Sequence, residues 1–528
     1  MKKSLLLFCC TLLFASSVFS ANLNVYASGL KVTGITDDKV SISYFLNAPA
    51  DEVLFLLLDG ANPDENNPVC SVDLGSNSAG AHTAVIDLSE RVGAYTWAIK
   101  ATCNIVNKEI TKVVGGHGSD SRFNFFTPGG VAVDNNPNSP YFGRIYVTES
   151  RKDVKTTSGR QVQQGVYVYG ADLSDVTGKG LEPYTGGVAW NENVTSGEVP
   201  HAAYGPARIT IDEEGYVYIC DNGPVADGTS GVWRMNPANP SAGFKDVLAD
   251  GNNSSRGDLY ERINSAAVKK IDDKKYLFAI DNECENSSVA RLLTIPLEVS
   301  PAIQKEQKKS MTLSYTYGGE NHNILSPYNT IVNGIYGDLW IFQYNNDNNT
   351  RPVIMHVNSN NEIDFKYTLR YCRRGAGAVS PDGEMLVFNG VYDGNRIRFF
   401  KISYDENKKP TLTESNICIT GTGENVDGIA FDVAGNLYFA SATTEWFYAY
   451  ALPKANNTHT TIAPNNQKIS LSAPRMMAYD LRMDLVESDF NFSFYANSTP
   501  TTGKLLFYRG NDRQVVVKEI ELTSLKKR

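Results

Sequence analysis

The sequence predicts an all-β protein in which a six-bladed β-propeller lies between an N-terminal β-sandwich and a small C-terminal β-module. Three observations lead to this fold class. Short apolar stretches with strand alternation fill residues 22–103, a unit of two or three strands recurs six times between 106 and 455, and no stretch sustains the 3.6-residue period of an amphipathic helix. The 28 tyrosines and 23 phenylalanines suit the packing between successive sheets.

Length and charge limit the function classes. A chain of 528 residues has room for two to four domains. Its 49 Lys and Arg residues against 58 Asp and Glu residues give a net charge of −9. Nucleic-acid binding depends on clustered cations, so we expect no nucleic-acid partner.

Residues 1–20 resemble a secretory signal peptide. Lys2 and Lys3 precede an apolar run from Leu5 to Phe14, and small residues lead to a cleavage position before Ala21. The run is shorter than the roughly 20 residues that cross a bilayer, and no later window is apolar enough, so we expect no transmembrane segment. The predicted location is the periplasm, the cell surface or the medium. Export permits a disulfide between Cys70 and Cys103, and buried free thiols are the alternative.

Two similar β-modules are expected to flank the central repeats. The first spans residues 21–105 and has the strand spacing of a small sandwich. The second spans residues 456–528, and its segment 489–497 aligns with segment 39–47 of the first. The sequence therefore predicts a C-terminal module of the same kind as the N-terminal one.

The central region, residues 106–455, repeats one structural unit. Each unit has an apolar strand, a D-x-x-G or similar turn, and a second, aromatic-rich strand. Such a sheet cannot bury both faces alone, and radial packing of successive sheets solves that problem. The units begin near Pro128, Pro206, Asn264, Tyr328, Gly375 and Val426.

At these residues the chain resembles the NHL-repeat and gluconolactonase type of six-bladed propeller, whose blades open with P-x-G-[IVL]-A-[IVF]-D-x-x-G-N. The flanking modules resemble Ig-like modules of the flagellar hook-capping type. Signal peptide, Ig-like module, propeller and C-terminal module together are similar to a family of exported proteins of unknown function from the Bacteroidota. The resemblance to gluconolactonases implies a metal-binding carboxylate at Asp427, within Val426-Asp427-Gly428-Ile429, whereas Gly375 stands where that family has a ligand asparagine.

Candidate site residues gather at one end of the repeated unit. The start of a first strand and the end of a second strand lie at the same end of an antiparallel sheet, so one face collects both. The carboxylates predicted there as metal ligands are Glu149, Asp221, Asp281 and Asp427. The residues predicted to contact a ligand are Arg208, Asn222, Asn282, Glu283 and Asn329, with Trp190 and Tyr204 as aromatic platforms. The alternative is that Asp and Asn merely satisfy their own turns.

These features favour a non-catalytic binding protein that recognises a glycan or a protein at the cell surface. No nucleophile elbow, H-E-x-x-H pair or complete phosphate loop is present in the sequence. The first alternative is a lactonase or other hydrolase that depends on a divalent cation such as calcium, and the second is a structural protein of surface assembly. We expect no cofactor for the binding function, and the sequence leaves the oligomeric state open.

Overall fold

The computed structural model describes residues 23–36, 39–88, 91–151, 154–176, 188–190, 205–221, 231–239, 244–249, 263–281, 291–297, 309–312, 314–317, 320–323, 329–345, 351–369, 372, 374–390, 396–471, 478–487, 489–496, 503–509 and 512–522. Within this part the protein consists of β-strands and connections, and the helical segments are short 3-10 turns such as η1 (Ser121–Phe123) and η6 (Asn465–Gln467). The all-β prediction is confirmed.

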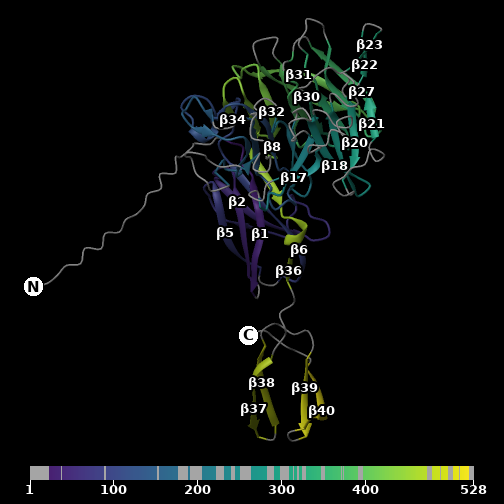
Figure 1. Ribbon diagram of the computed structural model, residues 1–528. Helices are drawn as coiled ribbons and strands as arrows, with labels where there is room; N and C mark the ends of the chain where they lie inside the picture. Colours follow the sequence, from purple (N-terminus) through teal and green to yellow (C-terminus); the bar gives the residue numbers. More distant parts are fainter. Residues whose placement is uncertain are drawn as a thin grey trace, which may run out of the picture.

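Two antiparallel sheets near the N-terminus share one apolar core (Figure 1). One contains β1 (Ala27–Thr36), β2 (Lys39–Leu46) and β5 (Gly80–Asp87), and the other is built on β3 (Glu52–Asp59), β4 (Cys70–Asp73) and β6 (Gly93–Cys103). In β2 every second side chain is buried, from Val40 to Leu46, and these side chains share the core with Phe55 and Trp97 of the other sheet. The period-2 alternation of the sequence therefore specifies which face is buried.

The predicted boundary at residue 456 needs correction, because the next two strands belong to the N-terminal part. β35 (Asn457–Ile462) pairs with the Cys103 end of β6, and β36 (Ile469–Leu471) pairs with the Gly93 end of the same strand. The chain thus returns after the central region to complete the sheet of β3, β4 and β6. The disulfide permitted by the sequence is not formed, since Cys70 and Cys103 are both free thiols.

Six four-stranded antiparallel sheets are described in the central region. In chain order the first three are β8 (Pro128–Val133), β9 (Ile145–Glu149), β12 (Gly165–Tyr169) and β13 (Val188–Ala189); β14 (Ile209–Ile211), β15 (Val217–Asp221), β16 (Gly231–Met235) and β17 (Phe244–Ala249); and β18 (Ile263–Ile271), β19 (Lys274–Asp281), β20 (Arg291–Pro296) and β21 (Lys309–Thr312). The other three are β24 (Thr330–Asn333), β25 (Leu339–Phe342), β26 (Arg351–Val357) and β27 (Ile363–Leu369); β28 (Gly377–Val379), β29 (Met385–Gly390), β30 (Arg396–Tyr404) and β31 (Pro410–Ile419); and β32 (Val426–Phe431), β33 (Leu437–Ser441) and β34 (Trp446–Ala451) with β7 (Thr111–Val114).

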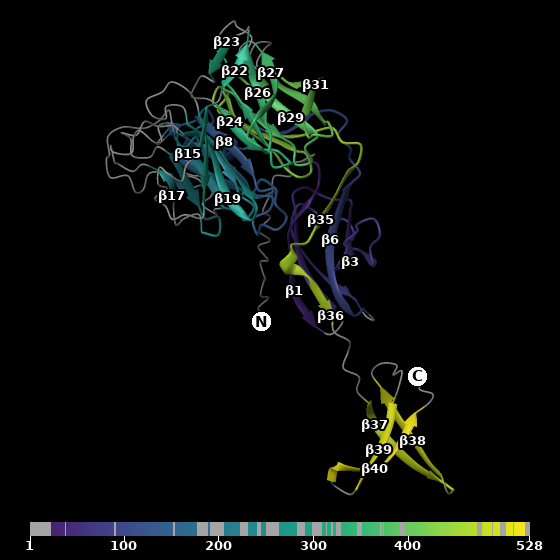
Figure 2. The same cartoon turned by 90° about the vertical axis from the view of Figure 1, so that its right-hand side faces the viewer.

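The arrangement of these sheets is propeller-like (Figure 2). The first strand of each sheet contacts the first strand of the next, in the order β8, β14, β18, β24, β28 and β32, and β32 contacts β8 again. The sixth sheet takes its outer strand, β7, from the segment that precedes the first sheet. Each first strand pairs on one side only within the described residues, so it forms an edge of its sheet. We call these six strands the inner strands.

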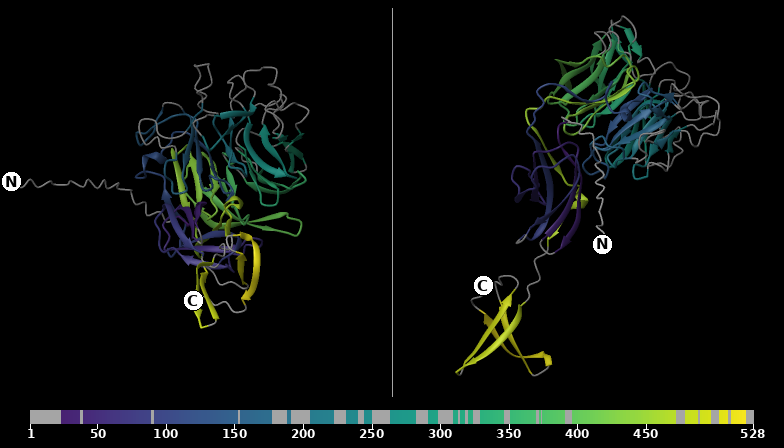
Figure 3. Two further views of the ribbon diagram at one scale, coloured as in Figure 1. Left: turned by 90° about the horizontal axis from the view of Figure 1, so that it is seen from below. Right: turned by 90° about the vertical axis from the view of Figure 1, so that its left-hand side faces the viewer.

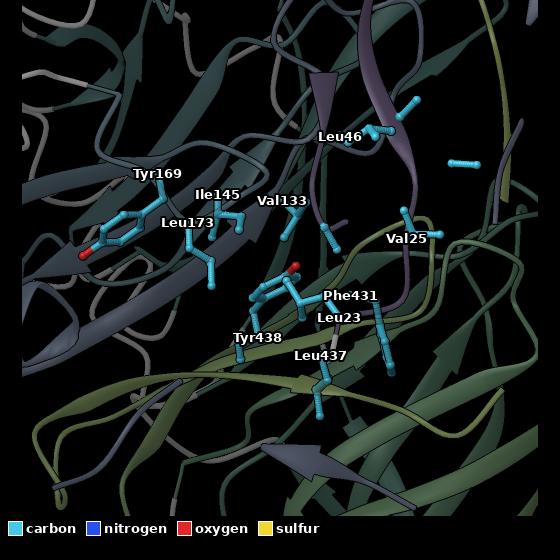
Figure 4. Close-up of a cluster of buried hydrophobic side chains, with 14 of the residues drawn as sticks. Leu23, Val25, Leu46, Val133, Ile145, Tyr169, Leu173, Phe431, Leu437 and Tyr438 are labelled. Atoms are coloured by element: carbon cyan, nitrogen blue, oxygen red, sulfur yellow. The ribbon is translucent and has the colours of Figure 1, made fainter. Parts of the chain in front are cut away.

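One continuous core joins the N-terminal sheets to the first and sixth central sheets. Figure 4 shows Leu23 and Val25 beside Val133 and Ile145 of the first sheet and Phe431, Leu437 and Tyr438 of the sixth. Buried asparagines fix the same contact. Asn24 donates its backbone N–H to Oδ1 of Asn436 at 2.7 Å, and its carbonyl accepts from Nδ2 of Asn436 at 2.9 Å. Amides that are buried and fully hydrogen-bonded between two domains indicate a specific packing interface between them.

Four strands follow at the C-terminal end. β37 (Ala478–Val486) pairs with β38 (Asp489–Ala496), and β39 (Gly503–Arg509) pairs with β40 (Asp512–Leu522). The two hairpins lie beyond the N-terminal sheets in Figures 1 and 3. Their large apolar residues stay exposed, with Leu485 at 65% and Phe490 at 56%. Two smaller hairpins, β10 (Val154–Lys155) with β11 (Gln161–Val162) and β22 (Ser314–Tyr317) with β23 (Glu320–Asn323), lie between central strands in the sequence.

Candidate ligand-binding site

The candidate site lies where the inner strands begin, and β-bulges mark the place. In β18 Ile263 pairs with Asp281 and Ser265 with Ile280, which leaves Asn264 as the extra residue. In β32 Val426 pairs with Ser441 and Gly428 with Ala440, which leaves Asp427 as the extra residue. A bulge redirects the side chain at that position. Arg208 and Asn329 come just before β14 and β24, so they belong to the same end of the inner strands.

Arg208 connects four of the six sheets. Its Nε donates to the hydroxyl of Thr330 at 3.1 Å, and its NH2 nitrogen donates to the carbonyl of Arg374 at 2.9 Å. Its NH1 nitrogen lies 3.2 Å from the carboxylate of Asp427 in an ion pair whose two side chains are each 9% exposed. Burial lowers the pKa of the guanidinium, and the Asp427 carboxylate opposes that shift. A planar fork of N–H donors is needed to reach three partners at once, which explains why arginine occupies this position.

Asp427, the predicted metal ligand, has two guanidinium neighbours. Besides Arg208, Nε of Arg374 lies 3.6 Å from the same carboxylate oxygen. That nitrogen also donates to Oδ1 of Asn425 at 3.1 Å. A divalent cation at Asp427 would have to compete with two resident positive charges, so electrostatics disfavours it. Thr330 and Arg374 complete this cluster, and no motif in the sequence pointed to either of them.

Two buried amides at the same end have no hydrogen-bond partner among the residues that the structure describes. Asn264 is 3% exposed and Asn329 is 0% exposed, and neither amide oxygen nor amide nitrogen of these residues is paired within the described chain. Both residues adjoin the cluster. Asn329 precedes Thr330, which binds Arg208, and Asn264 precedes Ser265, whose hydroxyl accepts the N–H of Ile331 at 3.0 Å. Buried polar groups are normally paired, so two unpaired amides in neighbouring sheets call for an explanation.

Glu149, another predicted metal ligand, is fully buried at the end of β9 and is held by backbone. Its carboxylate accepts the N–H of Phe126 at 2.8 Å, of Thr127 at 3.0 Å and of Arg151 at 2.8 Å. Burial raises its pKa to about 7, although these N–H groups oppose the shift. Glu149 thus anchors the segment that enters β8.

Asp221 and Trp190 meet at the corresponding place in the second sheet. Nε1 of Trp190 donates to Oδ2 of Asp221 at 3.1 Å, and the indole packs against Trp233 and Phe244. Trp190 is 7% exposed, so the ring predicted to stack on a ligand is largely covered by protein. Gly205 lies so close to Asp221 that an added Cβ would be 2.2 Å from the carboxylate.

The remaining predicted residues are not brought into this cluster. Asp281 lies at the end of β19, where it pairs with Ile263 and Arg291, but nothing is described of its side chain. Tyr204, Asn222, Asn282 and Glu283 lie outside the described residues. Among the side chains that are described, no group of three His, Cys, Asp or Glu residues is placed to hold a metal ion.

Fold and site together define an all-β, propeller-like protein with a buried polar cluster where its inner strands begin. No protein-family model matches the sequence, and no curated protein matches it significantly. Similar solved structures include a structural genomics protein of unknown function from Bacteroides thetaiotaomicron VPI-5482, with 12% identity, a TM-score of 0.37 and coverage of 81% of this chain and 98% of that chain. Others are the Kuenenia stuttgartiensis hydrazine synthase (12% identity, TM-score 0.36, coverage 62% and 84%) and the Dos1 propeller (10% identity, TM-score 0.30, coverage 60% and 69%).

Among the described residues no helix is long and apolar enough to span a membrane.

Proposed function

We propose that this chain is an exported, non-catalytic binding protein: a closed six-bladed propeller, carried on an Ig-like sandwich, that recognises a glycan at the end where its inner strands begin. The ring of contacts between the inner strands supports the closed propeller. The sequence resemblance and the signal-like residues 1–20 support export and the Ig-like module.

The unpaired amides of Asn264 and Asn329 carry the binding proposal, which requires the groups that cover these two buried side chains to move aside when the glycan binds. An asparagine amide offers two N–H donors and one carbonyl acceptor, and a sugar hydroxyl both donates and accepts, so the two groups are complementary. Each buried polar group left unpaired costs about 1–3 kcal/mol, a penalty that a bound hydroxyl removes. The adjoining Arg208 and Asp427 are already rigid through their mutual ion pair, which gives the site a fixed shape.

The observed partners of the carboxylates favour binding over metal-assisted hydrolysis. Asp427 is held by Arg208 and Arg374, and Glu149 is held by three backbone N–H groups. A catalytic metal needs several protein ligands and an open position for water. Metal analysis of the purified protein tests this alternative: stoichiometric calcium or zinc that is lost in Asp427→Asn would favour the hydrolase.

A glycan array with the purified protein tests the binding function. We expect Asn264→Ala and Asn329→Ala each to weaken binding of the captured glycan about tenfold, which corresponds to one lost set of hydrogen bonds. Their stability should stay equal to wild type or rise, because each substitution removes an unpaired buried group.

Asn333→Ala is the matched control for Asn329→Ala. Asn333 lies at the other end of the same strand, β24, and its amide donates to the carbonyl of Val268 at 2.9 Å. The Asn333→Ala variant should lower the stability of the protein and leave its affinity for the glycan unchanged. An array that stays silent across host and dietary polysaccharides, or Asn264 and Asn329 variants that bind normally, would refute the proposal.

A further inference from the structure

A cavity lies at the opposite end of the inner strands. It has a volume of about 520 Å³ and is lined by residues of all six inner strands and of the turns that follow them. Its wall is mixed, with apolar residues such as Val131, Ile209, Val268, Val332 and Phe431 among polar and charged ones. Its size falls within the range of about 300–1,000 Å³ that is usual for small-molecule sites.

Most charged side chains around this cavity are already paired. Lys275 lies 2.9 Å from the carboxylate of Asp212 and 2.6 Å from that of Glu214, and Lys270 lies 3.5 Å from that of Glu213. Asp134 accepts the hydroxyl of Ser139 and a backbone N–H, and burial raises its pKa to about 6. Ordinary ion pairs and turn contacts therefore account for these groups.

Lys269 is different, because its charge has no anionic partner in the described part of the chain. The ammonium group donates to the carbonyl of Gly337 and lies 4.5 Å from the ring centroid of Phe278. No carboxylate of the described residues lies within ion-pair distance of it. Burial lowers its pKa to about 8, and Asp338 opposes this shift. A partly buried ammonium without a counter-ion among the described residues is costly, and an anion bound in the cavity would relieve that cost.

We propose that this cavity binds a small organic carboxylate, with the carboxylate on the ammonium of Lys269 and an apolar body against Val268, Val332 and Phe431. The site is separate from the cluster around Arg208 and does not depend on the glycan proposal. The charge selects an anion, and the wall selects a body that gains from leaving water. The cavity volume of about 520 Å³ admits a one-ring or two-ring compound.

Matched pairs of probes test the proposal. Isothermal titration of the full chain with benzoate, 2-naphthoate and octanoate, each beside its neutral primary amide, measures what the negative charge contributes. We expect at least one carboxylate to bind saturably, with one site per chain, and about tenfold more tightly than its amide. If no carboxylate binds better than its amide, the proposal is wrong.

Variants then locate the site. Lys269→Gln should abolish the preference for the carboxylate, and Lys269→Arg should restore most of it. Lys270→Gln is the control, because that lysine is half exposed and already paired with Glu213. Asn264→Ala, at the other end of the inner strands, should not change carboxylate binding, which separates this outcome from that of the glycan site. A preference that survives Lys269→Gln in a protein with unchanged thermal unfolding would overturn the assignment.

Discussion

At the scale of single residues, Arg208 is the side chain whose loss should cost most. Arg208→Met keeps the bulk of the side chain but leaves the buried Asp427 with only the longer contact to Arg374 at 3.6 Å. Removing one partner of a buried ion pair typically costs about 3–5 kcal/mol. We expect a loss of that order in the free energy of unfolding, measured by urea denaturation.

Glu414→Gln is the control for Arg208→Met. Glu414 pairs with Arg398 at 2.8 Å, but its side chain is 38% exposed. Exposed ion pairs contribute about 0–1 kcal/mol, so the control should barely change the urea midpoint. Equal losses in the two variants would show that Arg208 is not the central link between sheets.

His356 supplies a second prediction, on pH. Its Nε2 lies 2.8 Å from Asp338 and its Nδ1 2.6 Å from Asp364, so the ring bridges two carboxylates next to Trp340. Both nitrogens can donate only in the imidazolium form. The two aspartates raise the pKa of His356 above its ordinary value of about 6.5, although burial opposes them.

A raised folded-state pKa means that His356 stabilises the protein fully below pH ~6.5 and that this contribution is lost as pH rises through the folded pKa. The difference in unfolding free energy between wild type and His356→Gln should thus be greatest, about 1.5–3 kcal/mol, at pH 5.5–6 and should shrink toward pH 9. Taking the difference between wild type and His356→Gln at each pH cancels the contributions of other titrating groups such as Glu149. A difference that is constant with pH would mean that the histidine acts only by packing.

The residues of the cluster differ in how far the sequence revealed them. Arg208, Asn329 and Asp427 stood out because each lies at the start of a repeated strand, as Asn264 also does, and the repeat fixes which end of the sheet that is. Their contacts were not predictable. Asp427 suggested a metal, whereas its partner is an arginine from a sheet that comes much earlier in the chain. A single sequence does not show which side chain of another sheet will contact Asp427.

At the scale of elements, Gly115 tests how β7 joins the sixth sheet. It follows β7 with φ of +106°, and an added Cβ would lie 2.3 Å from Cδ1 of Tyr448 and 2.8 Å from the carbonyl of Phe447. Gly115→Ala should therefore lower the free energy of unfolding through both backbone strain and overpacking. These cost about 1–2 and about 1–3 kcal/mol respectively.

Gly118→Ala isolates the first of those two costs. Gly118 has a similar φ of +90°, but nothing lies within 4 Å of its added Cβ. We expect Gly118→Ala to shift the thermal midpoint slightly and Gly115→Ala to shift it clearly more. Matching shifts would mean that β7 and β34 have room between them, contrary to their close pairing.

The strands were predictable where the turn between them has a physical signature. Asp212 accepts the N–H groups of Glu214 and Tyr216, and Asp432 accepts those of Ala434 and Asn436 in the same way. An aspartate that satisfies its own turn fixes the register of the two strands, which explains why D-x-x-G located them. The fourth sheet reverses the order, since Asp338 follows Gly334 and accepts the N–H of Tyr336, and its sequence match was correspondingly loose.

At the scale of the whole molecule, sequence alone misplaced β35 and β36. Their sequences look like ordinary short strands and do not reveal the strand with which they pair. That strand, β6, precedes all the central sheets in the chain. Long-range pairing of this kind depends on three-dimensional proximity, which local pattern does not encode. The internal repeat identified β38 correctly as a strand but gave no information on where the C-terminal part begins.

Two truncations therefore distinguish the predicted boundary from the observed one. Ending the chain after Leu471 removes β37–β40, whose described pairings are only with one another, so the unfolding free energy of the remainder should change by less than about 0.5 kcal/mol.

Ending the chain after residue 456 removes β35 and β36 and exposes the edge of β6 along Ala98 to Cys103. It also removes Asn457, whose Oδ1 accepts the N–H of Val25 at 2.8 Å beside the core shared with the central sheets. The shorter chain should unfold at a clearly lower temperature and tend to aggregate through the exposed strand. Calorimetry and light scattering on the two proteins measure both effects, and equal midpoints would show that β35 and β36 contribute nothing to the domain they complete.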